Sequence, residues 1–306
     1  MKAAWVAGGV RGRLMLERGL GVEGARELAR AGSLAAATSL LAGTMYAAAV
    51  DAGTLEEAER RLALAVALRV RTLAAWLPPE GTSLLRTIGG CFEIANIEDR
   101  LGYLAGGRLW PPIPLGVLAS IWSAASEIED PAELRRLLAA SSWGAPAGDR
   151  PEDILLALRF GWARRVTAQV PEAVRWAAGA AAIVLASELF LAGRPVDPAL
   201  APVAVLGRAW PGAGSIPDLR TRLPAAAAWS LTGIESPADL WRAGFTWWRR
   251  VTADAGALTS SGLLGRGTIV GVAALLALDA VRVATALRVA ASGGGPIAGE
   301  VLDGLC

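Results

Sequence analysis

Polar and apolar positions along the chain predict helices throughout, because no alternation is long enough to indicate a β-strand. Three acidic segments have the composition of a helix start: "TLEEAERR" (54–61), "RPEDILLA" (150–157) and "SPADLWRA" (236–243). Thr54 and Ser236 would cap their helices by accepting free backbone N–H groups. Pro151 and Pro237 would occupy the first helical position. We therefore predict an all-α fold.

A short string recurs in these helices and indicates an internal repeat. "ARRVTAQV" (163–170) returns as "WRRVTADA" (248–255), and "LRVRTLAA" (68–75) is a fainter copy. The shared element is R-x-x-T, at Arg69/Thr72, Arg164/Thr167 and Arg249/Thr252. A segment that starts with Leu and ends in an aromatic residue precedes each copy: "LLAGTMY" (40–46), "LLAASSW" (137–143) and "LPAAAAW" (223–229). One match could be chance in a chain rich in Ala and Leu, but a matching order of features indicates repetition.

Each copy continues into an apolar helix that contains one carboxylate: Glu93, Glu188 or Asp279. The carboxylate follows the arginine by 24 residues in two copies (93 − 69, 188 − 164) and by 30 in the third (279 − 249). Glycines follow each of these helices, in "LAGG" (104–107), "LAGRP" (191–195) and "AASGGG" (290–295), where we expect left-handed helix ends. Because each unit alone has a modest core, its neighbours must cover it. We predict three helical repeats, at 1–107, 108–195 and 196–306.

The hydropathy of the chain raises the question of membrane insertion. The mean hydropathy is +0.43, and the uncharged run 31–50 reaches the length of about 20 residues that a spanning helix needs. That run consists mostly of Ala, Ser, Thr and Gly, and charged residues interrupt the apolar segments 176–193 and 268–290. A charge at the bilayer centre costs at least about 2.5–3.5 kcal/mol. Buried core helices are the favoured interpretation, with a polytopic membrane protein as an alternative.

Composition argues against most catalytic classes. The chain has no histidine, only two cysteines, and a net charge of +2 without a concentrated basic patch. Neither "GGVRGR" (8–13) nor "LLGRGT" (263–268) has the spacing of a nucleotide-binding loop. We expect no catalytic residue, cofactor, metal or nucleic-acid partner, and no secretory signal at the N-terminus.

Two segments resemble a known family. In "LLRTIGGCFEIANIEDRLGYLAGG" (84–107), Glu93, Asn96, Ile97 and Arg100 match the central helix of the C-type subunits of V-type rotary ATPases, which are relatives of the eukaryotic d-type subunits of the membrane sector. The segment 260–294 resembles the closing helix of that family, with Asp279 and Arg288 at its acidic and late basic positions. The start "WVAGGVRGRLM" and the end "GGGPIAGEVLDGL" are also similar to the family's ends.

This resemblance implies a funnel of three similar helical-bundle repeats around a pseudo-threefold axis. The funnel would be a peripheral protein on the cytoplasmic face of the membrane. Its partners would be central-stalk subunits of the D and F type and the membrane rotor ring of proteolipid subunits. The chain would be a non-catalytic socket that couples ATP to proton or sodium transport. The alternatives are a polytopic helical membrane protein and an unrelated α-helical repeat scaffold.

Candidate contact residues for these partners lie on the repeated helices. They are Glu93, Asn96, Arg100, Arg164, Arg165, Glu188, Arg249, Arg250, Asp279, Arg282 and Arg288. The three acids either face a cavity for docking or form pairs within their own helices. The paired arginines either bind acids of a partner or extend along the surface into solvent. Trp241 and Trp248 share a helix face, either for packing or as an exposed contact with the ring.

Overall fold

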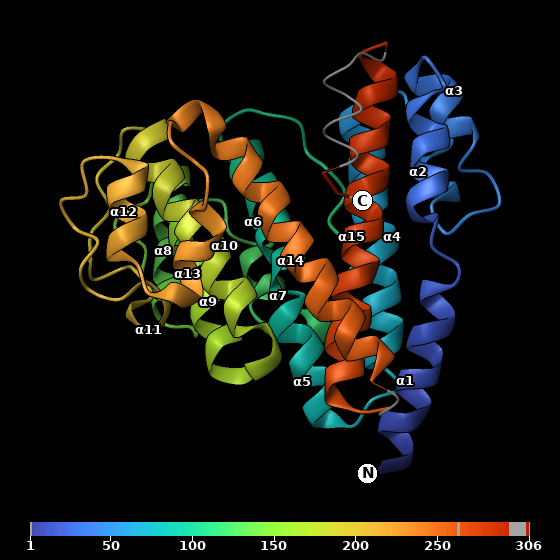
Figure 1. Cartoon of the computed structure of the whole chain (residues 1–306), viewed down its shortest axis with the longest axis horizontal. Helices are drawn as coiled ribbons and strands as arrows, with labels where there is room; N and C mark the ends of the chain where they lie inside the picture. The colour runs from blue at the N-terminus through green and yellow to red at the C-terminus, as the bar shows by residue number, and fades with distance from the viewer. Residues whose placement is uncertain (1, 262–263, 294–303, 306) are drawn as a thin grey trace. The chain divides into compact units, whose positions relative to one another are not determined.

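The computed structural model describes residues 2–261, 264–293 and 304–305 (Figure 1). Within these ranges the chain forms helices, turns and loops but no β-strand, which confirms the all-α prediction. The chain divides into two compact units. Unit 1 contains Met1–Leu85, Ile113–Val117 and Trp248–Cys306, and unit 2 contains Arg86–Pro112 and Leu118–Trp247. The three repeat ranges given above remain a prediction.

Unit 1 brings the two ends of the chain together. Its helices are α1 (Lys2–Leu16), α2 (Gly21–Ala29), α3 (Leu34–Ser39), the 3₁₀ turn η1 (Ala47–Ala49), α4 (Leu55–Ala74) and α15 (Arg266–Ala291). The uncharged run 31–50 therefore forms the short elements α3 and η1 with turns between them, rather than one long helix. Two further helices, α5 (Pro79–Ile88) and α14 (Leu240–Ser260), begin in one unit and end in the other.

The long helix α15 is the centre of unit 1 and packs against α1, α2, α3 and α4. Small residues allow close approach: a Cβ added at Gly12 of α1 would lie 3.0 Å from the side chain of Val272 in α15. α15 and the segment Pro171–Leu191 are long and apolar enough to cross a membrane. Of their most apolar windows, 72% and 50% respectively are buried inside the protein, and the core helix of a soluble protein has the same properties.

Unit 2 is built from the middle of the chain. Its main helices are α6 (Gly90–Leu104), α7 (Trp122–Ala125), α8 (Pro131–Ala139), α9 (Pro151–Gln169), α10 (Val174–Ala186), the π-helix η4 (Ser187–Leu191), α11 (Val203–Leu206), α12 (Ile216–Arg222) and α13 (Ala225–Ala228). Short 3₁₀ turns, η3 (Pro171–Ala173), η5 (Trp229–Leu231) and η6 (Pro237–Asp239), connect them, and the turn η2 (Gly116–Leu118) begins in unit 1 and ends in unit 2. One apolar core lies among α6 to α9, and Trp143 is its largest fully buried side chain.

The predicted helix starts are confirmed in two places and corrected in one. Thr54 Oγ1 accepts the N–H of Glu57 at 3.1 Å, and Pro151 is the first residue of α9. Ser236 instead precedes the short turn η6 and donates its hydroxyl to Asp239 Oδ2 at 2.8 Å. Its hydroxyl makes no cap to a backbone N–H.

The predicted glycine ends are confirmed for all three acid-bearing helices. Gly106, Gly193 and Gly293 have φ angles of +90°, +64° and +78°, and each lies two residues beyond the last helical residue. This left-handed conformation is strained for residues with a Cβ, so glycine is the favoured residue at these ends.

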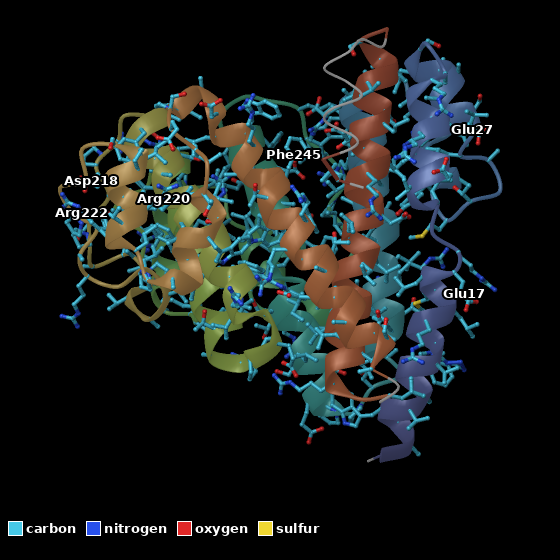
Figure 2. The ribbon with its side chains drawn as sticks, in the orientation of Figure 1. Glu17, Glu27, Asp218, Arg220, Arg222 and Phe245 are labelled. Atoms are coloured by element: carbon cyan, nitrogen blue, oxygen red, sulfur yellow. The ribbon has the colours of Figure 1, made fainter. Side chains whose placement is uncertain are left out.

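Surface loops are held by local ion pairs. On α12, Asp218 pairs with Arg222 at 2.8 Å and accepts the N–H of Gly214 at 2.9 Å (Figure 2). Arg222 also donates to the carbonyl of Pro211 at 3.0 Å. The carboxylate and guanidinium thereby attach the preceding loop to the helix.

Candidate functional site

Asp279 joins the C-terminal helix to the start of the chain. It is 7% exposed in the middle of α15 and accepts three hydrogen bonds from the N-terminal segment. Its Oδ1 accepts the N–H of Gly21 at 2.8 Å, and Oδ2 accepts the N–H of Leu20 at 3.0 Å and the hydroxyl of Tyr46 at 2.8 Å. Leu20 has no cap from a nearby side chain, so Asp279 supplies the negative charge that favours the N-terminus of α2.

Tyr46 is fully buried and depends on this carboxylate. Burial, and then the charge and hydrogen bond of Asp279, raise the pKa of the Tyr46 phenol far above its ordinary value. The positive charge of Arg69 opposes this rise in the pKa. The phenol therefore remains a neutral donor in the folded protein.

Glu93 makes the matching arrangement in unit 2. It is 1% exposed in α6 and accepts the N–H groups of Ser120, Ile121 and Trp122, each at 2.8 Å, just where α7 begins. The Ser120 hydroxyl donates to Glu93 as well and accepts the indole N–H of Trp143 at 2.9 Å. In both units, a buried carboxylate thus caps the start of another helical segment and is linked to the polar end of a buried aromatic residue.

The two aromatic residues lie in turns of the same construction. Thr44 Oγ1 accepts the N–H of Tyr46, and Ser141 Oγ accepts the N–H of Trp143, both at 3.1 Å. Each hydroxyl donates to the carbonyl three residues before it, at 2.7 and 2.8 Å. The turns are 97 residues apart in sequence (143 − 46), so the recurrence noted in "LLAGTMY" and "LLAASSW" has a structural counterpart.

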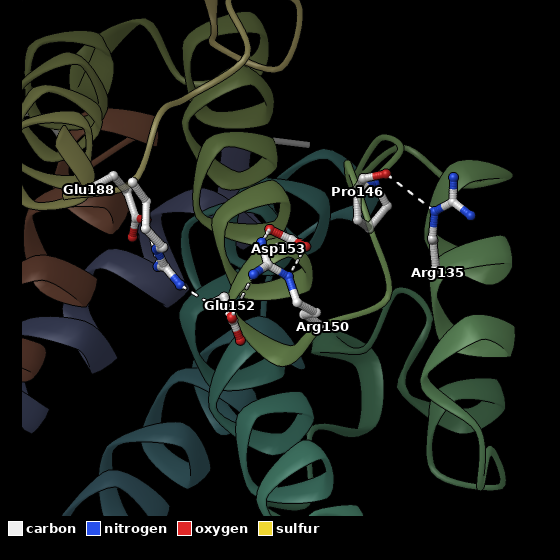
Figure 3. Close-up of polar contacts among 7 residues, drawn as sticks. Arg135, Pro146, Arg150, Glu152, Asp153 and Glu188 are labelled. Atoms are coloured by element: carbon white, nitrogen blue, oxygen red, sulfur yellow. Dashed lines mark hydrogen bonds and ion pairs between the residues drawn. The ribbon is translucent and has the colours of Figure 1, made fainter. Parts of the chain in front are cut away.

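Glu188 differs from the other two acids. It lies in η4, 6% exposed, and accepts both Nε (2.8 Å) and Nη2 (2.5 Å) of Arg194 at a single oxygen (Figure 3). The same guanidinium lies 3.7 Å from Glu152 at the start of α9, where Arg150 pairs with Asp153 at 3.0 Å. Glu188 therefore belongs to a partly exposed chain of alternating charges.

Two glycines help to explain why Glu188 differs from Glu93 and Asp279. A Cβ added at Gly90 would lie 3.1 Å from both Trp143 and Trp162, and one at Gly179 would lie 2.7 Å from Trp229 and 3.1 Å from Trp247. The second tryptophan of each pair, Trp162 or Trp247, donates its indole N–H to a backbone carbonyl two or three residues before the glycine. The acceptors are the carbonyls of Ile88 (3.1 Å) and Trp176 (2.7 Å). These glycines, in α6 and α10, therefore have matching surroundings. Three residues after them come Glu93 and Ala182, so Ala182, and not Glu188, occupies the matching place.

Several candidate arginines are used inside their own unit. Arg100 donates twice to the carbonyl of Ile128, at 2.9 and 2.8 Å. Arg164 donates to the carbonyls of Leu200 (2.8 Å) and Trp143 (2.7 Å), and burial lowers the pKa of its guanidinium. Asn96, on the same helix as Arg100, is 1% exposed. The two arginines join loops to helices within unit 2.

The candidates of unit 1 are more varied. Arg282 donates to the carbonyl of Leu305 at 2.8 Å rather than pairing with Asp279. Arg250 pairs with Asp254 at 2.9 Å, one turn later in α14. Arg288 is exposed and donates to Glu59 at 3.0 Å, which raises the pKa of its guanidinium. Arg249 is exposed on α14.

Trp241 is 48% exposed on α14 and meets Phe245 edge to face, with ring centroids 5.6 Å apart. Trp241 is therefore not a core residue, and of the two interpretations its exposure agrees with an exposed contact. Trp248 is half-buried.

Arg165 is the least satisfied polar side chain among the candidates. It is 8% exposed, and its guanidinium lies over the ring of Trp143 with 4.3 Å between the guanidinium carbon and the ring centroid. Its Nε and Nη1 are buried and have no hydrogen-bond partner among the residues that the structure describes. Burial lowers the pKa of Arg165; the charge of Glu93 opposes this and that of Arg86 adds to it.

Apart from Arg165, the networks around Asp279, Glu93 and Glu188 are suited to holding helices together, because the acids accept hydrogen bonds from other segments. Within the described ranges, no group of three or more Cys, Asp or Glu side chains is placed to hold a metal ion.

No known protein-family pattern and no curated protein matches the sequence. The sequence showed the acids and the aromatic residues but not the bonds between them. The signal available was the aromatic residue that recurs at the end of each Leu-initiated segment.

Proposed function

We propose that this chain is a non-catalytic coupling component of a V-type rotary ATPase, a socket between the central stalk and the membrane rotor ring. The observation that carries the proposal is the register of the carboxylate links. Glu93 caps a segment that follows it along the chain by about 27 residues, whereas Asp279 caps residues near the chain's beginning. The last acid-bearing helix thus bonds to the first aromatic segment. This is the connection expected if the repeats form a closed ring.

Three further features support this proposal. The described chain is all-helical, the acid-bearing helices end in the same glycine geometry, and the Thr of each R-x-x-T donates to the carbonyl four residues before it. These features are what repeated helical units would conserve physically, because they set where each helix ends and how its polar groups are paired.

On this proposal the buried acids and the exposed residues have different roles. Glu93 and Asp279 fix the shape of their bundles, because their oxygens are already used by backbone N–H groups. Contacts with partners fall to accessible side chains such as Arg249, Trp241 and Leu191, the last of which is 66% exposed at the end of η4.

The test is to recover the protein from its own cells through an affinity tag and to identify what accompanies it. Rotary ATPase components of the head, stalk and ring should co-purify from gently solubilised membranes. Alkaline carbonate should release the chain from membranes, since a peripheral socket is not embedded. Retention after carbonate would instead favour a polytopic protein that uses helices such as α15 as spans.

A charge-reversal pair sharpens the test. Arg249→Glu should reduce ATP-driven ion pumping by membrane vesicles more than it reduces ATP hydrolysis, because coupling rather than chemistry is affected. Arg208→Glu, at another exposed arginine, serves as the matched control. If no component of the ATPase co-purifies and deletion of the gene leaves pumping unchanged, the proposal is wrong, and an α-helical scaffold becomes the better description.

A further inference from the structure

The guanidinium of Arg165 is charged, buried and incompletely bonded. Nε and Nη1 are both buried without a partner in the described part of the chain. An arginine presents two edges that can each hold two oxygens, Nε with Nη2 and Nη1 with Nη2. Each edge of Arg165 therefore includes one buried N–H group that is unpaired. A buried donor without an acceptor is unfavourable, so the site gains most from a ligand that supplies oxygens.

The nearest acid is not available to supply these oxygens. Glu93 affects the pKa of Arg165, but its own carboxylate accepts three backbone N–H groups and the hydroxyl of Ser120. Arg86 adds a second positive charge nearby. Glu93 thus already accepts four hydrogen bonds, and an additional anion at Arg165 would offset the repulsion between Arg165 and Arg86.

The surroundings of Arg165 are fixed before any ligand arrives. The ring of Trp143 beneath it is fully buried and bonded to Ser120, and Arg164 holds the Trp143 carbonyl at 2.7 Å. Gly161 lies against the same carbonyl, since an added Cβ would come within 2.3 Å of its oxygen. A cation stacked on a rigid aromatic ring keeps its edges free for planar oxyanions.

We propose that Arg165, seated on Trp143, is a binding site for a small oxyanion with carboxylate or phosphate chemistry. The oxyanion is either a free ion or the tip of an acidic side chain on a partner protein. Because only 8% of Arg165 is exposed, the site admits a compact group and not an extended anionic surface. This inference is independent of the proposed rotary function.

The test follows the Nε–H resonances of the full-length protein labelled with ¹⁵N-arginine. Two probes are titrated at constant ionic strength, inorganic phosphate and N-acetyl-glutamate α-amide, with chloride as the reference anion. One resonance, identified by its loss in Arg165→Lys, should shift and saturate. Lysine keeps the charge but loses the two-oxygen fork, so binding should weaken by about tenfold or more. Arg208→Lys is the control that should leave the titration unchanged.

A second measurement covers the case in which Arg165→Lys does not fold. Hydrogen exchange of the wild-type protein should slow in the peptide 160–169 when the effective probe is added. A response to phosphate alone supports a free ion, a response to the glutamate analogue alone supports an acidic side chain, and both support a general oxyanion site. No saturable response to either probe, or the same response to chloride, overturns the inference.

Discussion

Replacing Tyr46 with Phe tests the link between the two ends of the chain most directly. The substitution removes only the phenolic hydroxyl and keeps the ring that fills the core. The hydroxyl lies 2.8 Å from Asp279 Oδ2, in a site where Tyr46 is fully buried. Hydrogen bonds to charged groups contribute about 1.5–3 kcal/mol to stability. Tyr46→Phe should therefore lower the free energy of unfolding of unit 1 by about this amount.

A double-mutant cycle with Asp279→Asn separates this bond from the other roles of the carboxylate. The asparagine keeps one acceptor for the N–H groups of Leu20 and Gly21 but loses the charge. Because Tyr46 and Asp279 are in direct contact, their effects should be non-additive, with a coupling of about 0.5–3 kcal/mol. Tyr103→Phe is the control: that residue is 40% exposed, so its effect should stay within about 0.5 kcal/mol.

The assay is urea unfolding combined with hydrogen exchange, because a chain with two compact units can unfold in more than one step. Peptides that cover residues 20–50 and 266–291 should lose protection together in Tyr46→Phe. Peptides from unit 2 should keep their protection. If the two substitutions are additive, or if the loss of protection spreads equally over both units, the carboxylate link does not hold these segments.

Three other predictions concern single features. Because the pKa of Tyr46 is raised, the stability that its neutral phenol contributes is present below about pH 10 and is lost as the pH rises further; tyrosinate absorbance should show Tyr46 ionising only as the protein unfolds. Gly161→Ala should destabilise unit 2 by about 1–3 kcal/mol, because its Cβ would lie 2.3 Å from a carbonyl oxygen; Gly256→Ala, with nothing within 4 Å, should instead stabilise α14 by about 0.5–1 kcal/mol. Thr54→Ala should cost about 1 kcal/mol through the lost helix cap, measured by thermal unfolding.

Features that depend on neighbouring residues were predictable from the sequence. The cap at Thr54, the first helical position at Pro151 and the left-handed glycine at 193 each follow from bonds that span a few residues. The all-α class follows from the same local preferences. Ser236 was the exception: its hydroxyl donates to the carboxylate of Asp239 and caps no backbone N–H.

Bonds between distant residues were not predictable. Nothing near Asp279 in the sequence indicates that its acceptors are used by residues more than 230 positions away. The spacing of 24 residues matched Glu93 with Glu188, but sequence spacing counts helical turns and loops together. Counted from the glycines with matching surroundings, Glu188 lies nine residues after Gly179 whereas Glu93 lies three residues after Gly90, and Glu188 meets Arg194 where Glu93 meets backbone N–H groups.

The carboxylate bonds of Glu93 and Asp279 differ in the length of chain that they close, and this difference bears on the order of folding. Glu93 lies on a helix that precedes the segment it caps. The first aromatic segment, at Tyr46, instead has its acid on the C-terminal helix, so this bond forms only after that helix has been made. Asp279 then closes contacts over 233 to 259 residues, whereas Glu93 closes its own over 27 to 29. Loop-closure entropy grows only slowly with length, so the long contact is thermodynamically feasible, but long-range contacts form slowly. Unit 1 must therefore complete its core after α15 has been made, while the α6–α9 bundle of unit 2 has all its parts earlier. The bonds of Asp279 then link the C-terminal helix to the N-terminal segment of the chain. A closed ring of repeats would need such a link, whereas an open row of repeats would not.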